Sequence, residues 1–482
     1  MRSAYFPILG LAWALTACGS SGDTEAAGGG ASTGSSSASG GNASTSSGMG
    51  GAAAGSTTGS ATTGGGGSPA VGACGVTADR VRITEIDVGA AVSNNEDEVA
   101  LKPLVISPIP SGGSRLAWMG GDGKIHVTKL DAGDHVSGAS IEVKGNDFSD
   151  LSADDQGGVV LLTRSQDCGA GSALCGAAPN PPIPCAGMYL VRFDEAGKEV
   201  WATRLTNPTT PYSDGANFIW WYAHHGRIAA SGTSYAAHFG TALSVTNGAM
   251  QCIDIHQGDR EKVVGLDGAV QPGGWDWGCS HSGYERVIWD EAAQRFAAVC
   301  KTDNQNRIMF NVSTEVRKLD LWYSNLGNLV PGAGGYWLTT SDIEPGQPPS
   351  AAGHADVHLL QFTTPAGGGG KATIGKDIVL AGKTGLNERA PHLAAYGSDR
   401  LLAAWETTTK VGDIARQDAG RKLQVQTRSR ATGEAEGEAF AVDVLGNRYQ
   451  ELIAFPDGSV AFPAPGSSGT KIKILRILPC AG

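Results

Sequence analysis

The sequence predicts an all-β protein, a seven-bladed β-propeller that follows a disordered, Gly/Ser-rich N-terminal linker. Three observations lead to this prediction. From Cys74 onward, short apolar runs alternate with Gly/Asp turns, and we find no convincing amphipathic helix. These runs group into about seven similar units over roughly 400 residues, a spacing expected of blades that contain four short strands each. No linker-like composition interrupts the units.

Each unit begins with a short apolar run, usually led by Gly or Asp, and continues with a second strand-like run. The dipeptides Asp122-Gly123 and Asp267-Gly268 between runs predict tight hairpins. Two packed β-sandwich domains would also fit such a pattern, but the even spread of the units favours the propeller. First runs include 113–118, 157–162, 226–231, 334–339, 399–405 and 458–462, and second runs include 125–130, 188–193 and 357–362.

The two ends of the repeated region predict how the ring closes. An isolated strand at 82–86 precedes the first unit, and the last unit, 471–478, can lie beside it. Cys74 and Cys480 flank the whole region, so a disulfide between them would lock the seam. Closing so long a loop contributes about 4 to 5 kcal/mol or more in the chain-entropy model. We therefore assign residues 73–482 to one propeller domain.

Two segments resemble blades of known propeller families. The segment 190–201, Leu-Val-Arg-Phe-Asp-Glu-Ala-Gly-Lys-Glu-Val-Trp, resembles a blade of the quinoprotein-like propellers. The segment 334–337, Gly-Gly-Tyr-Trp, resembles part of a kelch blade. Each resemblance covers one blade, and neither assigns the chain to a family.

The N-terminus predicts export and a lipid anchor. Residues 1–17 contain an apolar run and end in small residues, as a signal peptide does. Leu15-Thr16-Ala17-Cys18 resembles the lipobox of bacterial lipoproteins, which implies that Cys18 is the lipidated first residue of the mature chain. Gly19 in place of Asp favours the outer membrane or cell surface. Residues 18–72, almost entirely Gly, Ser, Ala and Thr, predict a flexible tether. An ordinary signal peptide with an incidental Cys is the alternative.

Composition excludes several classes of protein. With 36 basic and 47 acidic residues the net charge is −11, and no Lys/Arg cluster is present, which argues against a nucleic-acid partner. The 11 Trp, 10 Tyr and 11 Phe are enough for a substantial core, which excludes a wholly disordered chain. The only long apolar run is N-terminal, so no later helix is expected to span a membrane. We expect a monomer.

The cysteines indicate an oxidising compartment. Eight remain beyond Cys18, an even number that suggests disulfides in an exported chain, although 105 pairings are open. If Cys74 and Cys480 are bonded to each other, at least one bond must join the two remaining groups of three. Those groups are Cys168, Cys175 and Cys185, and Cys252, Cys279 and Cys300.

The stretch 212–285 is the candidate binding face, because histidines and aromatic residues concentrate there. Loops on one face of a rigid propeller are suited to recognition, and stacked indole and phenol rings favour sugar rings or peptide side chains. We therefore predict non-enzymatic binding of a glycan or a protein partner. The predicted ligand-binding residues are Trp220, Trp221, Tyr222, Trp275, Trp277 and His281.

Two other interpretations of the same stretch stay open. His224, His256 and His281 could hold a divalent metal ion in a hydrolase or lyase that acts on extracellular polysaccharide, with Asp259 or Asp276 as a base. Alternatively, the side chains only seal contacts between blades. No metal-binding His motif, nucleophile elbow or phosphate loop is present, so the sequence implies no other cofactor and does not decide whether the protein is an enzyme.

Overall fold

The computed structural model describes most of the chain after residue 73. The signal peptide, the tether and Cys18 lie outside the described residues, so the predictions for them stay predictions. Of the described strands, residues 217–218, 242–246 and 252–257 are described by their backbone alone. The described ranges are 74–95, 101–165, 186–206, 217–218, 225–246, 252–281, 284–320, 324–343, 353–382, 385–412 and 420–480.

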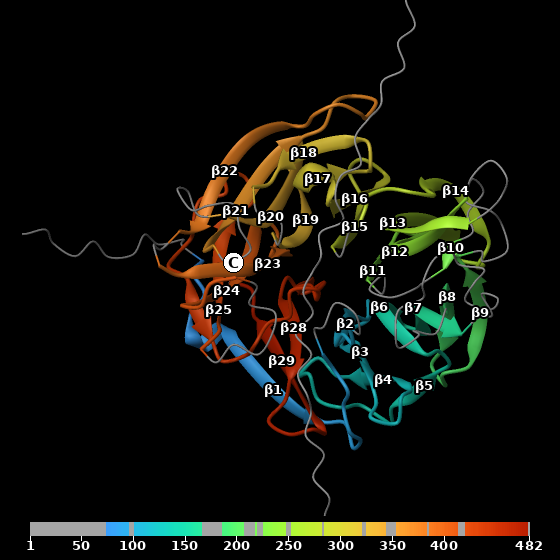
Figure 1. Ribbon diagram of the computed structural model, residues 1–482. Helices are drawn as coiled ribbons and strands as arrows, with labels where there is room; N and C mark the ends of the chain where they lie inside the picture. Colours follow the sequence, from blue (N-terminus) through green and yellow to red (C-terminus); the bar gives the residue numbers. More distant parts are fainter. Residues whose placement is uncertain are drawn as a thin grey trace, which may run out of the picture. The chain divides into compact units, whose positions relative to one another are not determined.

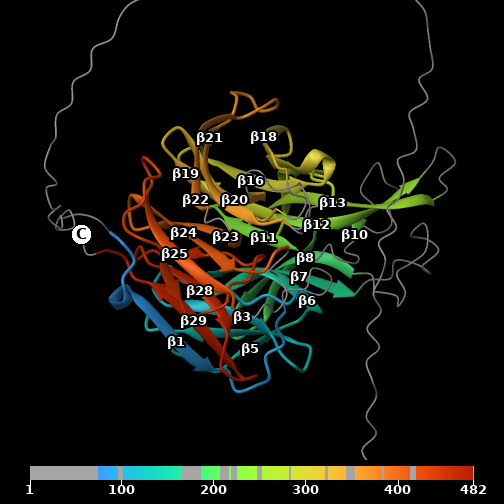
Figure 2. The same cartoon turned by 60° about the vertical axis from the view of Figure 1, so that its left-hand side comes forward.

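Seven antiparallel sheets form the seven blades, which confirms the predicted fold class (Figure 1). In each blade neighbouring strands pair with each other, and the innermost strands of adjacent blades contact one another around the axis. The turns at Asp122-Gly123 and Asp267-Gly268 form as predicted, with both glycines at positive φ. Figure 2 shows the same blades from the side.

The first three blades contain β2 to β14. Blade one has β2 (Val105–Pro108), β3 (Ser114–Met119), β4 (Ile125–Leu130) and β5 (Ile141–Val143). Blade two has β6 (Asp147–Asp154), β7 (Gly157–Ser165), β8 (Ala186–Asp194) and β9 (Glu199–Arg204). Blade three has five strands, β10 (Asn217–Phe218), β11 (Gly226–Ala230), β12 (Ser234–Thr246), β13 (Cys252–Gly265) and β14 (Val270–Trp275).

The remaining blades contain β15 to β29 together with β1. Blade four has β15 (Glu285–Asp290), β16 (Arg295–Thr302), β17 (Arg307–Phe310) and β18 (Thr314–Lys318). Blade five has β19 (Leu326–Gly332), β20 (Gly335–Ile343), β21 (Ala355–Thr363) and β22 (Thr373–Ala381). Blade six has β23 (Asn387–Tyr396), β24 (Arg400–Thr408), β25 (Lys422–Ser429) and β26 (Phe440–Val442). Blade seven has β27 (Ile453–Ala454), β28 (Val460–Pro465), β29 (Lys471–Ile477) and β1 (Val81–Asp87).

Helical structure in the described ranges consists of the short 3₁₀ turns η1 (Ala78–Arg80) and η4 (Asn304–Asn306). No helix in those ranges has the length and apolar character that crossing a bilayer requires. The central strands owe their form to continuous apolar runs such as 159–162, which are buried on both faces between neighbouring blades.

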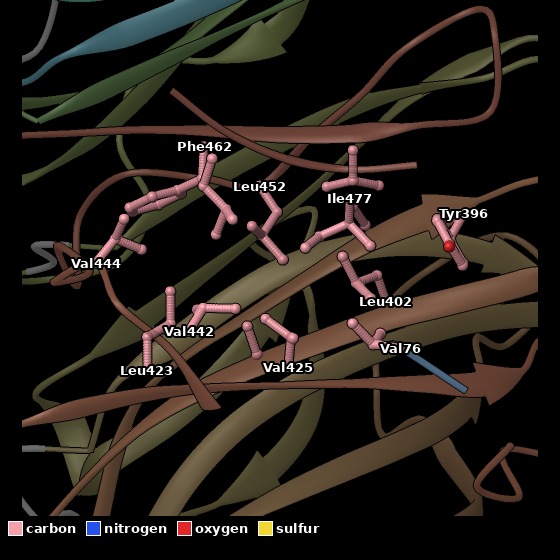
Figure 3. Close-up of a cluster of buried hydrophobic side chains, with 14 of the residues drawn as sticks. Val76, Tyr396, Leu402, Leu423, Val425, Val442, Val444, Leu452, Phe462 and Ile477 are labelled. Atoms are coloured by element: carbon pink, nitrogen blue, oxygen red, sulfur yellow. The ribbon is translucent and has the colours of Figure 1, made fainter. Parts of the chain in front are cut away.

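Blade seven closes the ring as the sequence predicts. β1 pairs along its whole length with β29, so the first strand of the domain completes the last blade. The predicted Cys74–Cys480 disulfide lies at this seam and joins residues 406 positions apart. The apolar core behind the seam packs blade six against blade seven, with Leu402, Val425 and Ile477 among its members (Figure 3).

A second disulfide joins Cys279 to Cys300 and fixes the segment between blades three and four to β16. Cys168, Cys175 and Cys185 and the side chain of Cys252 lie outside what the structure describes. The predicted bond between the two cysteine groups therefore stays a prediction.

Candidate functional site

Charged side chains gather near the beginnings of the innermost strands. Arg227 and Arg286 are each the second residue of their strand, β11 and β15, and Asp150 lies within β6. All three are buried. A charged group that is buried at the axis needs a partner of opposite charge, because burial removes its hydration.

The partner is Glu451, which lies on a buried segment, 446–452, between β26 and β27. Its Oε1 lies 3.1 Å from Arg227 Nε and 3.2 Å from Arg286 Nε. Its Oε2 accepts a hydrogen bond of 2.9 Å from Asn328 Nδ2, on β19. One carboxylate therefore ties the inner strands of blades three, four and five to the chain that enters blade seven.

The rest of the 446–452 segment packs at the same end of the axis. The Tyr449 ring stacks on His225 at 4.4 Å and on Tyr284 at 5.3 Å between centroids. Gln450 accepts from the Leu104 amide and donates to the Pro463 carbonyl. A cavity of about 10 Å³ beside Asp150, Arg227 and Glu451 leaves room for about one water. Within the described residues, this end of the axis is filled by the protein's own side chains.

The pKa values of these side chains are shifted in the directions expected of buried groups. Burial raises the pKa of Asp150 to about 7, and Arg227 opposes the shift. Burial and the nearby Arg227 lower the pKa of Arg286 to about 10. Burial also lowers the pKa of His392 to about 3, so this imidazole is neutral. Burial is thus the largest cause of the pKa shift in all three groups.

A separate apolar hollow of about 220 Å³ lies toward the other ends of the innermost strands. It is lined by residues of β15, β19, β23 and β27, including Trp289, Val330 and Ala395. The Trp289 indole N–H is held by Glu291 at 2.6 Å. This hollow was not expected from the sequence.

The junction of blades three and four contains a buried imidazole–carboxylate pair. His238 Nε2 lies 2.6 Å from Asp259 Oδ2, and both side chains are fully buried. His238 Nδ1 lies 3.2 Å from the carbonyl oxygen of Arg286, which can only accept a hydrogen bond. Although burial opposes protonation, the Asp259 carboxylate raises the pKa of His238. Both ring nitrogens of His238 therefore face acceptor oxygens, an arrangement that favours the protonated imidazole.

Two further buried carboxyl groups face this pair. Glu261 lies directly across from His238 in the β12–β13 ladder, and Glu285 begins β15. Burial raises the pKa of both to about 7, with the negative charge of Asp259 adding to the effect. Near neutral pH both groups therefore hold their protons about half of the time.

The same Asp259 fixes the segment 275–281, which we call the braced segment. Its Oδ1 accepts hydrogen bonds from the Cys279 amide at 2.7 Å and from Trp275 Nε1 at 3.3 Å. Asp276 accepts from Arg260 and from Lys262, the latter at 2.6 Å. With the disulfide to Cys300, these contacts hold the segment at several points along its length.

The braced segment brings together three of the predicted ligand-binding residues. Trp277 is half-buried, and its ring lies against Gly258, where an added Cβ would approach the indole to 2.6 Å. His281 pairs with Asp303 at 2.9 Å and lies in the left-handed region, at φ 48°. Trp275 is half-buried and its N–H is bonded to Asp259, so this indole supports the segment.

The other predicted site residues are not tested. Trp220, Trp221, Tyr222 and His224 lie outside the described residues, as does the side chain of His256. The predicted grouping of His224, His256 and His281 around a metal ion therefore stays a prediction.

A different group of metal-type ligands does meet at the junction. Ligand atoms of His238, Asp259 and Cys300 lie within 4.8 Å of one another. The Cys300 sulfur, however, is bonded to Cys279, which leaves one imidazole and one carboxylate. Catalytic zinc sites use three protein ligands, so with the disulfide closed these residues do not make a complete site.

The sequence analysis missed Arg227, Arg286, Glu285 and Glu451. A signal for the first three was present, since each lies in a run that is otherwise apolar, as in Gly226-Arg227-Ile228 and Glu285-Arg286-Val287. A charge in a strand that is buried on both faces indicates a polar cluster. Glu451 has no such signal, because it lies in a connection.

Comparisons with known proteins assign the chain to no family. No family model and no curated protein matches the chain. Among solved structures, the Dos1 propeller is similar at 10% identity and a TM-score of 0.40, over 76% of this chain and 77% of the other. A Dyadobacter fermentans protein of unknown function matches at 12% identity and a TM-score of 0.39, over 83% and 99%. A Penicillium chrysogenum α-L-arabinanase complexed with arabinobiose matches at 10% identity and a TM-score of 0.39, over 82% of this chain and 98% of the other. Likeness at this level carries no argument about activity.

Proposed function

We propose that this chain is a non-catalytic recognition protein of the bacterial cell envelope that binds a glycan through the braced segment, 275–281. The observation that supports the proposal is the fixation of this segment by Asp259, Asp276 and the Cys279–Cys300 disulfide. A surface that is already ordered before binding loses less entropy when the ligand arrives.

The chemistry of the braced segment fits a sugar ring. Trp277 offers an indole surface, which is large and rigid. Asp276, the residue before it, is exposed, and so is His281 at the end of the segment. A carboxylate and an imidazole can hydrogen-bond sugar hydroxyls at the edge of the stacked ring. An apolar platform with a few polar groups around it is the usual composition of a small-ligand site.

The envelope location is part of the same proposal. The chain would be exported by residues 1–17, lipidated at Cys18 and held away from the outer membrane by residues 18–72. The two disulfides support an oxidising compartment, since such bonds persist in exported proteins.

The buried pair at the junction favours recognition over hydrolysis. His238 and Asp259 would be a suitable acid–base pair by chemistry, but both are fully buried and both are used to hold neighbouring backbone and the braced segment. A general base must reach the proton that it removes. The hydrolase or lyase hypothesis therefore depends on His224, His256 and His281.

The proposal is tested by applying the full chain to a panel of immobilised neutral and acidic polysaccharides. We expect the wild type to bind at least one of them, and Trp277→Ala to lose that binding. Trp289→Ala is the matched control, because it removes a half-buried indole near the other end of blade four. It should bind as the wild type does.

Binding of Trp277→Ala at wild-type affinity would overturn the proposal, as would failure of the wild type to bind any polysaccharide. Depolymerisation of a bound polysaccharide, lost after metal chelation and in His281→Ala, would establish the hydrolase or lyase instead.

A further inference from the structure

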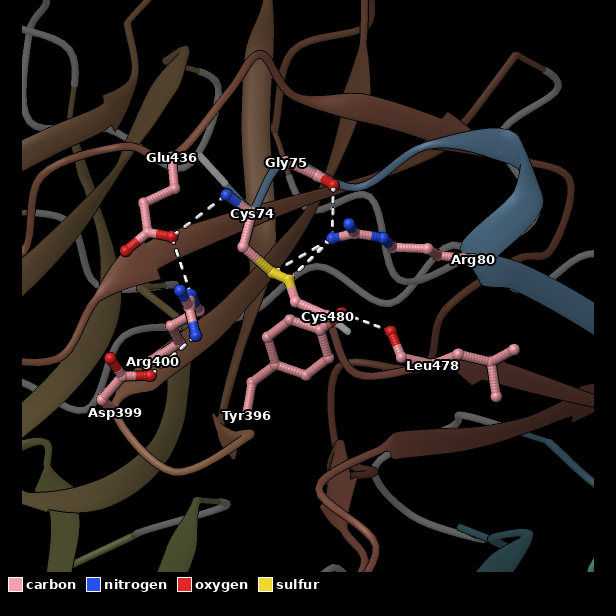
Figure 4. Close-up of a disulfide and its surroundings, with 9 residues drawn as sticks. All are labelled: Cys74, Gly75, Arg80, Tyr396, Asp399, Arg400, Glu436, Leu478 and Cys480. Carbon is pink, nitrogen blue, oxygen red and sulfur yellow. Dashed lines mark hydrogen bonds and ion pairs between the residues drawn. A yellow bond between two sulfur atoms is a disulfide. The ribbon is translucent and has the colours of Figure 1, made fainter. Parts of the chain in front are cut away.

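Arg80 lies directly on the disulfide that closes the ring (Figure 4). Its Nη1 is 3.1 Å from Cys74 Sγ and 2.6 Å from Cys480 Sγ, and it donates to the Gly75 carbonyl at 3.2 Å. Arg80 ends the short turn η1, just before β1 begins. The turn therefore places a permanent positive charge against both sulfur atoms of the seam.

No carboxylate of the described residues pairs with this guanidinium. Glu436 is nearby, and its Oε2 accepts from the Cys74 amide, but the same oxygen is bound by Arg400 at 2.7 Å. Arg400 also binds Asp399 at 2.7 Å. These two acidic groups thus neutralise Arg400. Arg80 interacts electrostatically with the adjacent, exposed Asp79 and with the Tyr396 hydroxyl, while its Nη1 lies against the two sulfur atoms.

The two disulfides differ in access and in electrostatics. Cys480 is partly exposed, whereas Cys74 is 2% exposed. In the other disulfide both cysteines are buried, at 2% for Cys279 and 1% for Cys300. Cys300 also lies beside the Asp259 carboxylate, which disfavours a second negative charge.

A neighbouring arginine changes the chemistry of a disulfide because it stabilises the thiolate. Thiol pKa values fall next to Lys or Arg, and a thiol of lower pKa leaves faster in thiol–disulfide exchange. When the bond is intact Arg80 faces two neutral sulfur atoms, and after reduction it would face thiolates. The arrangement therefore favours the reduced form relative to a disulfide without such a neighbour.

We propose that Cys74–Cys480 is a reducible latch, a site of thiol–disulfide exchange with dithiols, and that Cys279–Cys300 is a structural bond that resists them. A thiolate of the dithiol attacks the sulfur of the partly exposed Cys480, a new S–S bond forms there, and Cys74 leaves as a thiolate beside Arg80. The second thiol of the reagent, once deprotonated, attacks its own sulfur in the mixed disulfide and releases the Cys480 thiolate. The dithiol becomes a disulfide, and its two electrons remain on the two cysteines.

The latch controls the covalent tie between the two ends of the domain. The reduced ring keeps the β1–β29 ladder but loses the bond that joins residue 74 to residue 480. The segment that begins at Cys74 would then be joined to the last blade only by the pairing of β1 with β29. The envelope partner that fits this site is a protein with an exposed, reduced dithiol.

The test is reduction of the full chain by dithiothreitol, with free thiols trapped by alkylation over time and each cysteine quantified by peptide mass mapping. We expect Cys74 and Cys480 to become alkylated at least about tenfold faster than Cys279 and Cys300. Arg80→Gln should slow reduction of the seam by about tenfold, and Arg80→Lys should restore most of the rate because it keeps the charge. At equilibrium a tenfold change corresponds to about 30 mV in reduction potential.

Arg82→Gln is the matched control, since it removes the same charge from β1 at a guanidinium that binds Asp134 instead of the disulfide. It should leave the rate at the seam unchanged. Circular dichroism of the oxidised variants verifies that each is folded, and the pH dependence of alkylation in the reduced chain reports the thiol pKa. Equal reduction of the two disulfides, or a folded Arg80→Gln variant with wild-type rate and thiol pKa, would overturn the proposal.

Discussion

The seam of the ring and the junction of blades three and four are both closed by a disulfide, but the charges around the two bonds are of opposite kind. At the seam, Cys74–Cys480 lies under Arg80, whose Nη1 contacts both sulfur atoms. At the junction, Cys279–Cys300 lies beside Asp259, which is bound to His238. The charges beside a disulfide should therefore decide how easily it is reduced, and with it whether the bond is a reducible latch or a structural bond.

The comparison predicts unequal losses of stability when each bond is removed. Cys74→Ser with Cys480→Ser opens a loop of 406 positions, and should lower the free energy of unfolding by about 6 kcal/mol. Cys279→Ser with Cys300→Ser opens a loop of 21 positions, and should cost about 3 kcal/mol. Urea unfolding measured by tryptophan fluorescence checks both. A larger loss at the junction would show that the β1–β29 ladder closes the ring without help.

Replacing each tryptophan of the braced segment should show that Trp275 contributes more to stability than Trp277 does. Trp275→Ala removes the indole that donates to Asp259 and contacts His238 edge-on, so we expect a loss of about 3 kcal/mol. Trp277→Ala removes a ring that lies over Gly258 and should cost less than about 1 kcal/mol. Thermal unfolding of the two variants measures the difference. Equal losses would mean that Trp277 is also structural.

The junction also predicts a dependence of stability on pH. Because the pKa of Glu285 is raised to about 7 in the folded state, this state holds the proton more tightly than the unfolded chain does. The contribution of Glu285 is most favourable below its ordinary pKa, is lost as pH rises from that value to about 7, and is constant above it. Glu285→Gln carries no such proton and keeps the shape of the side chain. Above pH 7 it should therefore be more stable than the wild type, by on the order of 1–3 kcal/mol.

Urea unfolding at pH 5 and pH 8 tests this expectation, with Glu434→Gln at an exposed carboxyl as the matched control. A Glu285→Gln variant that is less stable than the wild type at pH 8 would show that the carboxylate has a partner that stabilises its charged form.

The sequence predicted more of the fold than of the candidate site. Apolar runs, hairpin dipeptides and the positions of Cys74 and Cys480 were enough to predict the blades and their closure, because each depends on local pattern or on the ends of the chain. The pair of His238 and Asp259 depends on the register of the β12–β13 ladder, in which Asp259 is the diagonal neighbour of His238 on the same face. Such a register cannot be counted from spacing alone.

The role of Glu451 could not be predicted from the sequence. It meets Arg227 and Arg286 only because a connection between two blades passes along the axis, and the partners are far apart in sequence. The sequence grouped Trp277 and His281 next to Cys279, and the structure shows which contacts hold that segment. Their role in ligand binding stays a prediction.

The most direct test of the account compares the affinity of one bound polysaccharide fragment for three forms of the protein. These are the wild type, the Cys279→Ser/Cys300→Ser variant and the Cys74→Ser/Cys480→Ser variant, measured by isothermal titration calorimetry at a temperature where all three are folded. The account predicts that the first variant binds about tenfold more weakly, with a larger entropic loss, because the braced segment must be ordered on binding. The second variant should bind as the wild type does. Equal affinity in the wild type and in the Cys279→Ser/Cys300→Ser variant would contradict the account.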